Sequence, residues 1–445
     1  MNYVISKYVY LFASSKNDHL IYCSRSNTFL KTKRDLFEYL KQCQEDSSLI
    51  NDLDSDLLEL LKKNKIIVLG DEDNNFLLEH QFTEDSNCYE RSGLGLVLVP
   101  TLACNFDCPY CFETGKRACT MSDEIIEHLI SFIKMHTEAQ SFNITWYGGE
   151  PLLAFGKIRK IMERIDSDIS IPLRGQSIIT NGYLFNSEVI NFFKDHPLNS
   201  IQITLDGKKE RHDNLRKQKI TGDGTYDQII RNIDNILTEL PDTKLSIRVN
   251  IEKNNIEDFN ILNAELSERW KNKNVVLYPG ILRIDNEAQT ALSCASFNKW
   301  EEHELFFDLT TNRIIEDSIF PTLFHNQNCC ATRLNAYIIG PRGEIYKCWN
   351  DVSDDKKIIG YINEEKLTNP ALLYKYIVGS KWYHNNECVN CFFLPICHGN
   401  CAWYRLRNQY ENGKYNLCQC MQSAPDMLDK CLEHYYDEYK AEKHI

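Results

Sequence analysis

From Gly93 to about Ile284, short apolar runs alternate with longer stretches whose apolar residues repeat with a helical period. The apolar runs have the length of strands, and they are residues 94–99, 142–146, 176–179, 200–205, 244–251 and 275–278. Residues 122–136 are typical of the longer stretches, with Ser122 suited to cap a helix. Six strands with helices between them predict an α/β fold in which a parallel sheet curls toward a barrel. Because active sites in such folds lie at the carboxyl edge of the sheet, polar residues at the strand ends are candidates for chemistry.

Two further regions flank this core. The N-terminal region predicts a small, separately folded α+β unit, with strands at 8–13, 20–23 and 66–69 and helices at 33–42 and 57–65. The acidic, polar segment 71–92 would be its linker. Beyond about Ser296, a helical connector leads to a cysteine-rich tail, in which residues 336–348 predict a β-hairpin around Gly340-Pro-Arg-Gly343. The expected domains are therefore residues 1–92, 93–295 and 296–445.

Composition restricts the partners and the compartment. The net charge of −13 disfavours nucleic acid, because the protein's field would repel phosphate backbones. No apolar run approaches the ~20 residues that cross a bilayer, and the start of the chain lacks the pattern of a signal peptide. These features predict a cytoplasmic protein without a membrane partner. Disulfides do not persist in that compartment, so 18 cysteines, many of them clustered, indicate metal binding.

Three cysteines follow the first predicted barrel strand on one short loop, Cys104, Cys108 and Cys111. A redox dithiol would use only the last two and leave Cys104 unexplained. A structural zinc site needs four ligands, and Cys119 is the one nearby candidate for the fourth. Three cysteines on a four-iron cube leave one iron open to bind something else. The spacing and the strand context favour the iron–sulfur cluster over zinc or a dithiol.

The Cys-x3-Cys-x2-Cys pattern, with aromatic Tyr110 inside it, resembles the signature of the radical S-adenosylmethionine (SAM) superfamily. The resemblance implies a partial, TIM-like (β/α)6 barrel. It also implies a 4Fe-4S cluster on the three thiolates, with SAM chelating the open iron. Reduction of the cluster would then split SAM to methionine and a 5'-deoxyadenosyl radical, which takes a hydrogen atom from the substrate. An electron donor of the flavodoxin or ferredoxin type is implied as a partner.

Further motifs at successive strand ends fall where that family places its SAM contacts. The resemblance assigns this role to Tyr110, Gly148, Gly149, Glu150, Thr180, Asn181, Thr204, Asp206 and Arg216. Glycines allow close approach of the backbone to a ligand, and Arg216 could pair with a carboxylate. Any one of these motifs alone is also a common turn that starts a helix. Their recurrence at the ends of consecutive strands favours the cofactor interpretation.

The cysteine-rich tail resembles the SPASM extension of radical SAM enzymes, which carries two auxiliary 4Fe-4S clusters. By that resemblance the outer cluster is held by Cys388, Cys391, Cys397 and Cys418, and the inner cluster by Cys330, Cys348 and Cys401. The fourth inner ligand is open between Cys329, Cys294 and a vacant iron, and Cys420 competes with Cys418. Structural zinc sites also use the Cys-x2-Cys spacing and are the alternative for this tail.

SPASM-type enzymes act largely on ribosomally made peptides, so the resemblance implies a peptide maturase that forms a thioether or carbon–carbon crosslink in a precursor peptide. Residues 1–92 resemble winged-helix peptide-binding domains and could hold the leader of that precursor by strand addition. A structural cap over the barrel is the other interpretation of this region. Two alternatives for the whole chain are a sulfatase-type maturase that makes formylglycine and a non-catalytic, zinc-binding interaction protein.

Overall fold

The computed structural model describes residues 2–111, 118–282, 297, 299–315, 329–397, 399, 401–415, 417 and 425–443. The chain forms two compact units, each built from segments that are distant in the sequence. The barrel unit comprises Glu90–Phe297 and Arg333–Lys375, and the terminal unit comprises Met1–Tyr89, Asn298–Thr332 and Tyr376–Ile445. Cys294, Cys418 and Cys420 lie outside the described residues.

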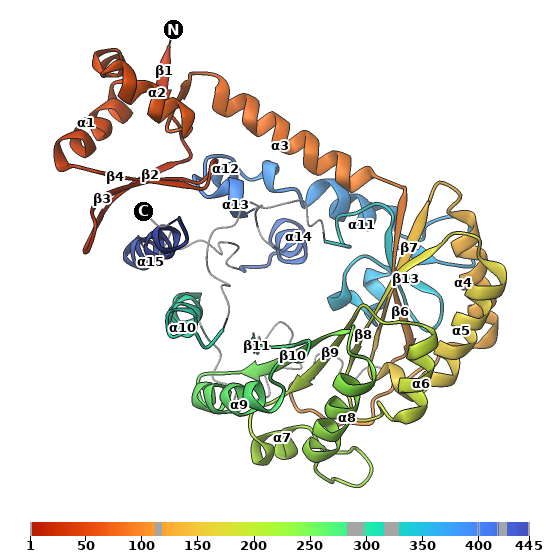
Figure 1. Ribbon diagram of the computed structural model, residues 1–445. Helices are drawn as coiled ribbons and strands as arrows, with labels where there is room; N and C mark the ends of the chain where they lie inside the picture. Colours follow the sequence, from red (N-terminus) through yellow and green to blue (C-terminus); the bar gives the residue numbers. More distant parts are fainter. Residues whose placement is uncertain are drawn as a thin grey trace. The chain divides into compact units, whose positions relative to one another are not determined.

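Six parallel strands form the core of the barrel unit, in the order in which they occur along the chain. They are β6 (Gly93–Thr101), β7 (Ser141–Gly148), β8 (Leu173–Thr180), β9 (Ser200–Leu205), β10 (Lys244–Ile251) and β11 (Val275–Ile281). The intervening helices are α4 (Asp123–Met135), η2 (Pro151–Ala154), α5 (Phe155–Asp168), α6 (Ser187–Asp195), α7 (Lys209–Leu215), α8 (Tyr226–Glu239) and α9 (Ile256–Arg269). Figure 1 shows the longer helices along the outer side of these strands. The predicted α/β fold with a curled parallel sheet is confirmed.

Alternation along the strands separates an outer apolar face from an inner polar one. In β9, Ile201, Ile203 and Leu205 are buried, whereas Gln202 and Thr204 are half-buried on the opposite face. On that inner face the Tyr278 hydroxyl of β11 donates a hydrogen bond to Gln202 Oε1 at 2.9 Å. The barrel therefore packs its helices through aliphatic side chains and turns polar side chains inward.

A hairpin from late in the sequence extends this sheet beyond β6. It consists of β12 (Ala336–Ile339) and β13 (Glu344–Tyr346), followed by β14 (Gly360–Tyr361). The predicted hairpin is confirmed by the antiparallel pairing of Ile338 with Tyr346. Its place was not predicted: β12 pairs in parallel with β6, so the tail covers the first edge of the barrel sheet. The short elements η4 (Trp349–Asp351), η5 (Asp355–Lys357) and α11 (Pro370–Tyr374) complete this unit.

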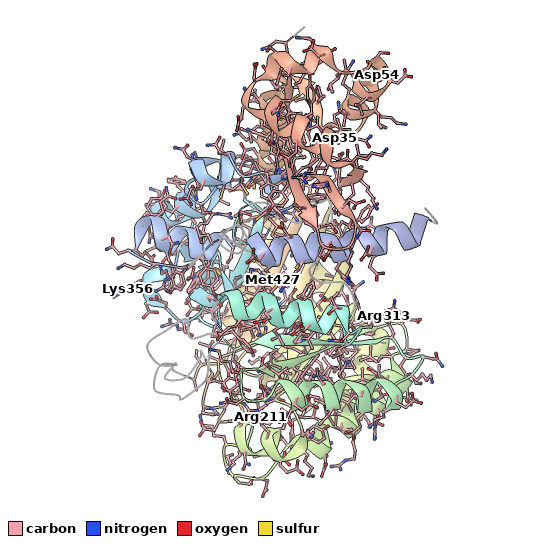
Figure 2. The ribbon with its side chains drawn as sticks, turned by 90° about the vertical axis from the view of Figure 1, so that its left-hand side faces the viewer. Asp35, Asp54, Arg211, Arg313, Lys356 and Met427 are labelled. Carbon is pink, nitrogen blue, oxygen red and sulfur yellow. The ribbon has the colours of Figure 1, made fainter. Side chains whose placement is uncertain are left out.

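The terminal unit contains a three-stranded antiparallel sheet that is covered on both faces. Its strands are β2 (Val9–Ser14), β3 (Asp18–Cys23) and β4 (Thr28–Thr32), while β1 (Tyr3–Ile5) pairs separately with β5 (Ile67–Leu69). Helix α1 (Arg34–Glu45), η1 (Ser47–Asp52) and α2 (Ser55–Lys63) share one apolar core with this sheet. The other face packs against α15 (Pro425–Lys443), on which Figure 2 labels Met427. The sequence predicted a separately folded N-terminal region. The structure differs, because this region shares an apolar core with the C-terminal helix α15.

The predicted linker 71–92 is wrong, because Glu72–Tyr89 form an α-helix of 18 residues, α3. Acidic residues in its first turn favour the positive end of the helix dipole. Its buried residues are Asp73, Glu84 and Cys88, and two of these three are acidic. This mixed face hides the helical period that an apolar stripe would have shown.

The remaining elements of the terminal unit are short and lie mostly in the cysteine-rich tail. They are α10 (Lys299–Thr311), the π-helical turn η6 (Lys375–Gly379), η7 (Trp382–His384), α12 (Asn386–Val389), α13 (Leu394–Cys397) and α14 (Ala402–Tyr410). Within the described part of the chain, no helix has the length and apolar character needed to cross a bilayer.

Candidate active site

The three-cysteine loop begins where β6 ends, at the carboxyl edge of the barrel sheet. The Phe106 amide donates to Cys104 Sγ at 3.4 Å, and the Cys111 amide donates to the Cys108 carbonyl at 3.2 Å. Burial raises the pKa of the Cys104 thiol to about 12 and that of Cys108 to about 11. The Cys108 and Cys111 thiols also raise the pKa of Cys104, and Cys111 raises that of Cys108, so the three lie close enough to interact electrostatically. Without a metal, the thiols of Cys104 and Cys108 therefore stay protonated at neutral pH.

Two glycines after β7 allow the cysteine loop to pack against the end of that strand. A Cβ on Gly149 would lie 2.4 Å from the Ala103 carbonyl oxygen, and Gly148 has φ of +137°. The amide of Glu150 donates to the same Ala103 carbonyl at 2.9 Å. The two glycines are therefore required for the approach of the loop backbone, whereas the sequence suggested an approach of the backbone to a ligand.

The carboxylate of Glu150 joins the ends of β7 and β8. It is fully buried and accepts hydrogen bonds from the Leu152 amide at 3.0 Å, the Thr180 hydroxyl at 2.8 Å and the Asn181 amide at 2.7 Å. Burial raises its pKa, and these three donors oppose that rise. The Asn181 side chain in turn donates to Asn105 Oδ1 of the cysteine loop at 2.8 Å. Glu150, Thr180 and Asn181 thus hold two strand ends and the loop in one arrangement.

A second network ties Tyr110 to the ends of β9 and β10. The Tyr110 hydroxyl donates to Asp206 Oδ2 and accepts a hydrogen bond from Arg216 Nη1 at 3.0 Å. Asn250 Nδ2 donates to Asp206 Oδ1 at 2.9 Å. Arg216 Nε is buried and has no partner among the described residues. Since Arg216 also lowers the pKa of Cys108, this arginine places an unused donor and a positive charge beside the cysteine loop.

His212 and Thr225 support this network from behind and were missed by the sequence analysis. The Asp206 amide donates to His212 Nδ1 at 3.4 Å, and His212 Nε2 lies 3.0 Å from the Thr225 hydroxyl. That hydroxyl donates to the Arg216 carbonyl at 2.7 Å. Burial and the nearby Arg216 charge hold the pKa of His212 well below its usual range, so the ring is neutral. Both residues lie in the connection that follows the predicted strand 200–205, and this position after a strand end is the signal that could have identified them.

The sequence analysis also missed Asn250, although it named Thr204. Both residues lie on the inner face, Thr204 in β9 and Asn250 in β10, and in each strand polar residues alternate with buried apolar ones. A polar residue at an inward position of a buried strand is the signal that could have identified Asn250.

The cysteine-rich tail of the terminal unit encloses a cavity of about 710 Å³. Cys388, Cys391 and Cys397 line it together with Arg405. The Arg405 guanidinium is buried and donates to the carbonyls of Ser380, at 2.5 Å, and Gly399. This places a positive charge beside three thiols.

The other predicted cluster ligands lie in different units. Cys330 and Cys401 are half-buried in the terminal unit, Cys401 directly before α14, whereas Cys348 is buried in the barrel unit. Among the described residues, no three His, Cys, Asp or Glu side chains are grouped closely enough to hold a single metal ion. A four-iron cube takes each thiolate on a different iron, so its ligands need not converge on one point.

A known family model, the radical SAM superfamily, matches residues 98–263. The match runs from β6 into α9 and includes the cysteine loop and both networks described above. Residues 98–263 form a radical SAM domain, and the protein is an enzyme of radical SAM chemistry. This identification sets aside the non-catalytic, zinc-binding alternative.

Relatives of this radical SAM enzyme are distant but extend over most of the chain. It is 25% identical over 355 residues to the cysteine-type anaerobic sulfatase-maturating enzyme of Clostridium novyi (strain NT), covering 74% of this chain and 92% of that protein. It is 20% identical over 472 residues to the radical SAM cyclopropyl synthase TigE of Paramaledivibacter caminithermalis, covering 93% and 92%. The crystal structure of Streptococcus suis SuiB bound to precursor peptide SuiA shares the fold, with a TM-score of 0.52, 15% identity and coverage of 94% and 100%.

Membership in the radical SAM enzymes implies a 4Fe-4S cluster and SAM. The residues of this chain fit both groups. Three half-buried thiols share one loop at the carboxyl edge of the sheet, and Cys108 and Cys111 act electrostatically on Cys104. Arg216 Nε and Asn105 Nδ2 are buried donors without partners among the described residues, and they suit the acceptor groups of a bound cofactor.

Proposed function

We propose that this radical SAM enzyme is a peptide maturase that introduces an oxidative crosslink, a thioether or a carbon–carbon bond, into a ribosomal precursor peptide. The similarity to TigE over 93% of the chain is the observation that carries this proposal, because it extends well beyond the radical SAM match at residues 98–263. The fold shared with SuiB, whose crystal structure contains a precursor peptide, supports the same substrate class.

Cys104, Cys108 and Cys111 would hold the catalytic cluster, which when bound and reduced splits SAM to a radical that takes hydrogen from the substrate. The protein supplies position and shelter for this chemistry. Gly148 and Gly149 seat the loop, and Glu150, Thr180 and Asn181 hold it against two strands. Arg216 and Asp206 fix Tyr110, and Arg216 leaves its free Nε for an acceptor on SAM. Thr204 lies on the inner face of β9, where it would contact SAM.

Two auxiliary clusters would accept the electron that an oxidative crosslink leaves over. We assign Cys388, Cys391, Cys397 and Cys418 to one, and Cys330, Cys348 and Cys401 to the other. The cavity lined by the first three cysteines supports the outer site, and the buried Arg405 charge would offset the negative charge of thiolate ligands there. A flavodoxin or ferredoxin would supply the electron for SAM cleavage.

Metal analysis of the protein purified without oxygen tests the three cluster sites. Three clusters predict ~12 iron atoms per chain with matching sulfide. Replacing Cys104, Cys108 and Cys111 together by Ala should remove about a third of the iron and abolish 5'-deoxyadenosine formation. Replacing Cys388, Cys391 and Cys397 together should remove a similar share without abolishing SAM cleavage. Cys119→Ala is the control and should change neither; full 5'-deoxyadenosine formation without the first three cysteines would refute the assignment.

The crosslink itself is tested with short candidate precursor peptides, chosen from any Cys-rich or repeat-bearing peptide genes found next to the gene of this enzyme. Incubation with the reduced enzyme and SAM should remove two hydrogens from the peptide, and tandem mass spectrometry should locate the new bond. The leader would bind residues 1–92 by adding a strand to an edge of the three-stranded sheet, β2 or β4. Hydrogen exchange should then slow in one of these two strands when the peptide is added. Slowing only in the helices would contradict strand addition.

A second candidate, a sulfatase-type maturase, is favoured by the 25% identity to the Clostridium novyi enzyme. It would oxidise a Cys or Ser side chain to formylglycine. Peptides that carry a sulfatase-type Cys or Ser site, supplied in the same oxygen-free assay, should then gain an aldehyde that a hydrazide reagent captures. The crosslinking proposal predicts no aldehyde.

A further inference from the structure

Three strands place a row of side chains on the inner face of the barrel. Thr204 of β9, Arg248 of β10 and Tyr278 of β11 are partners in the parallel register. Arg248 belongs to the inward set of its strand, because Leu245, Ile247 and Val249 alternate with it and are buried on the outer face. Arg248 is only half-buried, so a molecule inside the barrel can reach its guanidinium.

The guanidinium of Arg248 is held in place toward the carboxyl edge. Its Nε donates to Asn250 Oδ1 at 3.0 Å, and Asn250 is itself fixed by its hydrogen bond to Asp206. The side chain lies over Gly280 of β11, where a Cβ would come 2.3 Å from Nε. A larger residue than glycine there would displace the guanidinium. Among the described residues neither terminal nitrogen of Arg248 has a hydrogen-bond partner, and the two form a fork that matches a carboxylate.

No carboxylate among the described residues pairs with Arg248. Asp206, the nearest acid along the network, accepts from Tyr110 and Asn250. Glu252, which follows β10, pairs with Arg211, the residue labelled on α7 in Figure 2. Arg248 is thus held by a neutral amide and has no carboxylate partner among the described residues. Because it lies inside the barrel that the substrate would enter, it is a candidate site for an anion.

We propose that Arg248 binds a carboxylate of the substrate peptide, and so selects substrates with an acidic group near the position that reacts. This inference rests on the proposed peptide maturase. The carboxylate comes from an Asp or Glu side chain or from the C-terminus of the peptide. Arg248 thereby acts as a residue of substrate specificity.

Pools of short synthetic peptides test this proposal on the reconstituted full-length enzyme with SAM bound. The pools are random except for one central residue, Asp in one and Asn in the other, and each is made with a free C-terminal carboxylate and with a C-terminal amide. Peptides retained by the enzyme are identified by mass spectrometry. The wild type should favour the Asp pool or the free C-terminus by about tenfold, which also distinguishes the two sources.

Two variants and a control separate substrate binding from other effects. Arg248→Gln should lose the acidic preference, and Gly280→Ala should weaken it while the arginine and its charge remain. Arg174→Gln, an exposed arginine at the start of β8, changes the net charge equally and should keep the preference. Iron content and circular dichroism should match the wild type in all three. The dissociation constant for SAM, measured without peptide, should not change.

Several results would overturn the inference. Retention of the acidic preference by Arg248→Gln excludes the site, and a weakened SAM affinity in that variant would show that Arg248 binds the cofactor. If the wild type retains peptides without any acidic preference, the proposed role of Arg248 is refuted, whereas the peptide maturase proposal is not. If the wild type cleaves SAM but retains no peptide from any pool, the peptide maturase proposal fails as well.

Discussion

At the scale of single residues, buried polar groups hold the site together. Glu150, Asp206 and His212 are each almost completely buried, and each has partners on two or more segments of the chain. Removing one partner of a buried polar group leaves the others unsatisfied, which costs more than the hydrogen bond itself contributes. Substitutions here should therefore affect both stability and loop position.

The neutral His212 ring predicts a pH dependence of stability. Its pKa is lowered in the folded state, so the unfolded chain binds the proton more readily and stability falls as pH drops below the usual His value of about 6.5. His212→Asn keeps an acceptor for the Asp206 amide and removes the titration. The difference in unfolding free energy between wild type and variant, measured by urea unfolding, should shrink from pH 7.5 to pH 5.5. A difference that is constant with pH would contradict the neutral ring.

Gly149 predicts a loss of cluster loading. In Gly149→Ala the new Cβ would lie 2.4 Å from the Ala103 carbonyl oxygen, so the cysteine loop must move. Iron content and visible absorbance after reconstitution should fall, together with 5'-deoxyadenosine formation. The control is Gly156→Ala in α5, where nothing lies within 4 Å of the new Cβ and the helix should gain about 0.5–1 kcal/mol. Equal loading of the two variants would show that the glycine is not needed for the loop.

At the scale of elements, α3 is held to the cysteine-rich tail by charge as much as by apolar contact. Lys381 is fully buried and contacts Glu84 at 3.3 Å and Cys88 Sγ at 2.5 Å, while Trp382 Nε1 donates to the other oxygen of Glu84. These residues replace the apolar stripe that usually seats a helix. Helix α3 therefore lacks the apolar period from which the sequence would predict a helix. A few specific polar pairs anchor it instead.

This anchoring predicts a large effect of one substitution. Lys381→Met leaves Glu84 buried without its cation, and the loss of one partner from a buried pair costs about 3–5 kcal/mol. Lys414→Met removes an exposed lysine of the same unit and should change the unfolding free energy by less than about 0.5 kcal/mol. Urea unfolding followed by tryptophan fluorescence measures both variants. Similar stabilities would show that the pair contributes little.

At the scale of the whole molecule, each compact unit is assembled from segments distant in the sequence. The terminal unit joins the first 89 residues to the last 70 through the core formed by the three-stranded sheet and α15. The barrel unit recruits β12 from the cysteine-rich tail to the edge of β6. Truncation at either end of the chain would therefore expose apolar surface in the remaining part of the terminal unit.

The shared core predicts that α15 stabilises the N-terminal sheet. Leu432→Asp places a carboxylate at a buried position against β2–β4, so the sheet should open more often. Hydrogen exchange should speed up across residues 9–32 in this variant. Lys430→Asp, at an exposed position of the same helix, should leave these rates unchanged. If the hydrogen-exchange rates of the sheet are unchanged in both variants, packing against α1 and α2 alone stabilises the sheet.

The sequence by itself determined the six parallel strands, the helices between them and the cysteine loop at the carboxyl edge. These features follow from local periodicity and spacing, which a chain carries in consecutive residues. Only the tertiary structure decided that the Glu150 carboxylate binds Thr180 and Asn181 at the end of β8, that Asn250 joins Tyr110 and Asp206, and that β12 and α15 complete cores begun far upstream. Such contacts join residues tens to hundreds of positions apart, and no local pattern encodes which distant segment will satisfy a buried polar group or cover an apolar face.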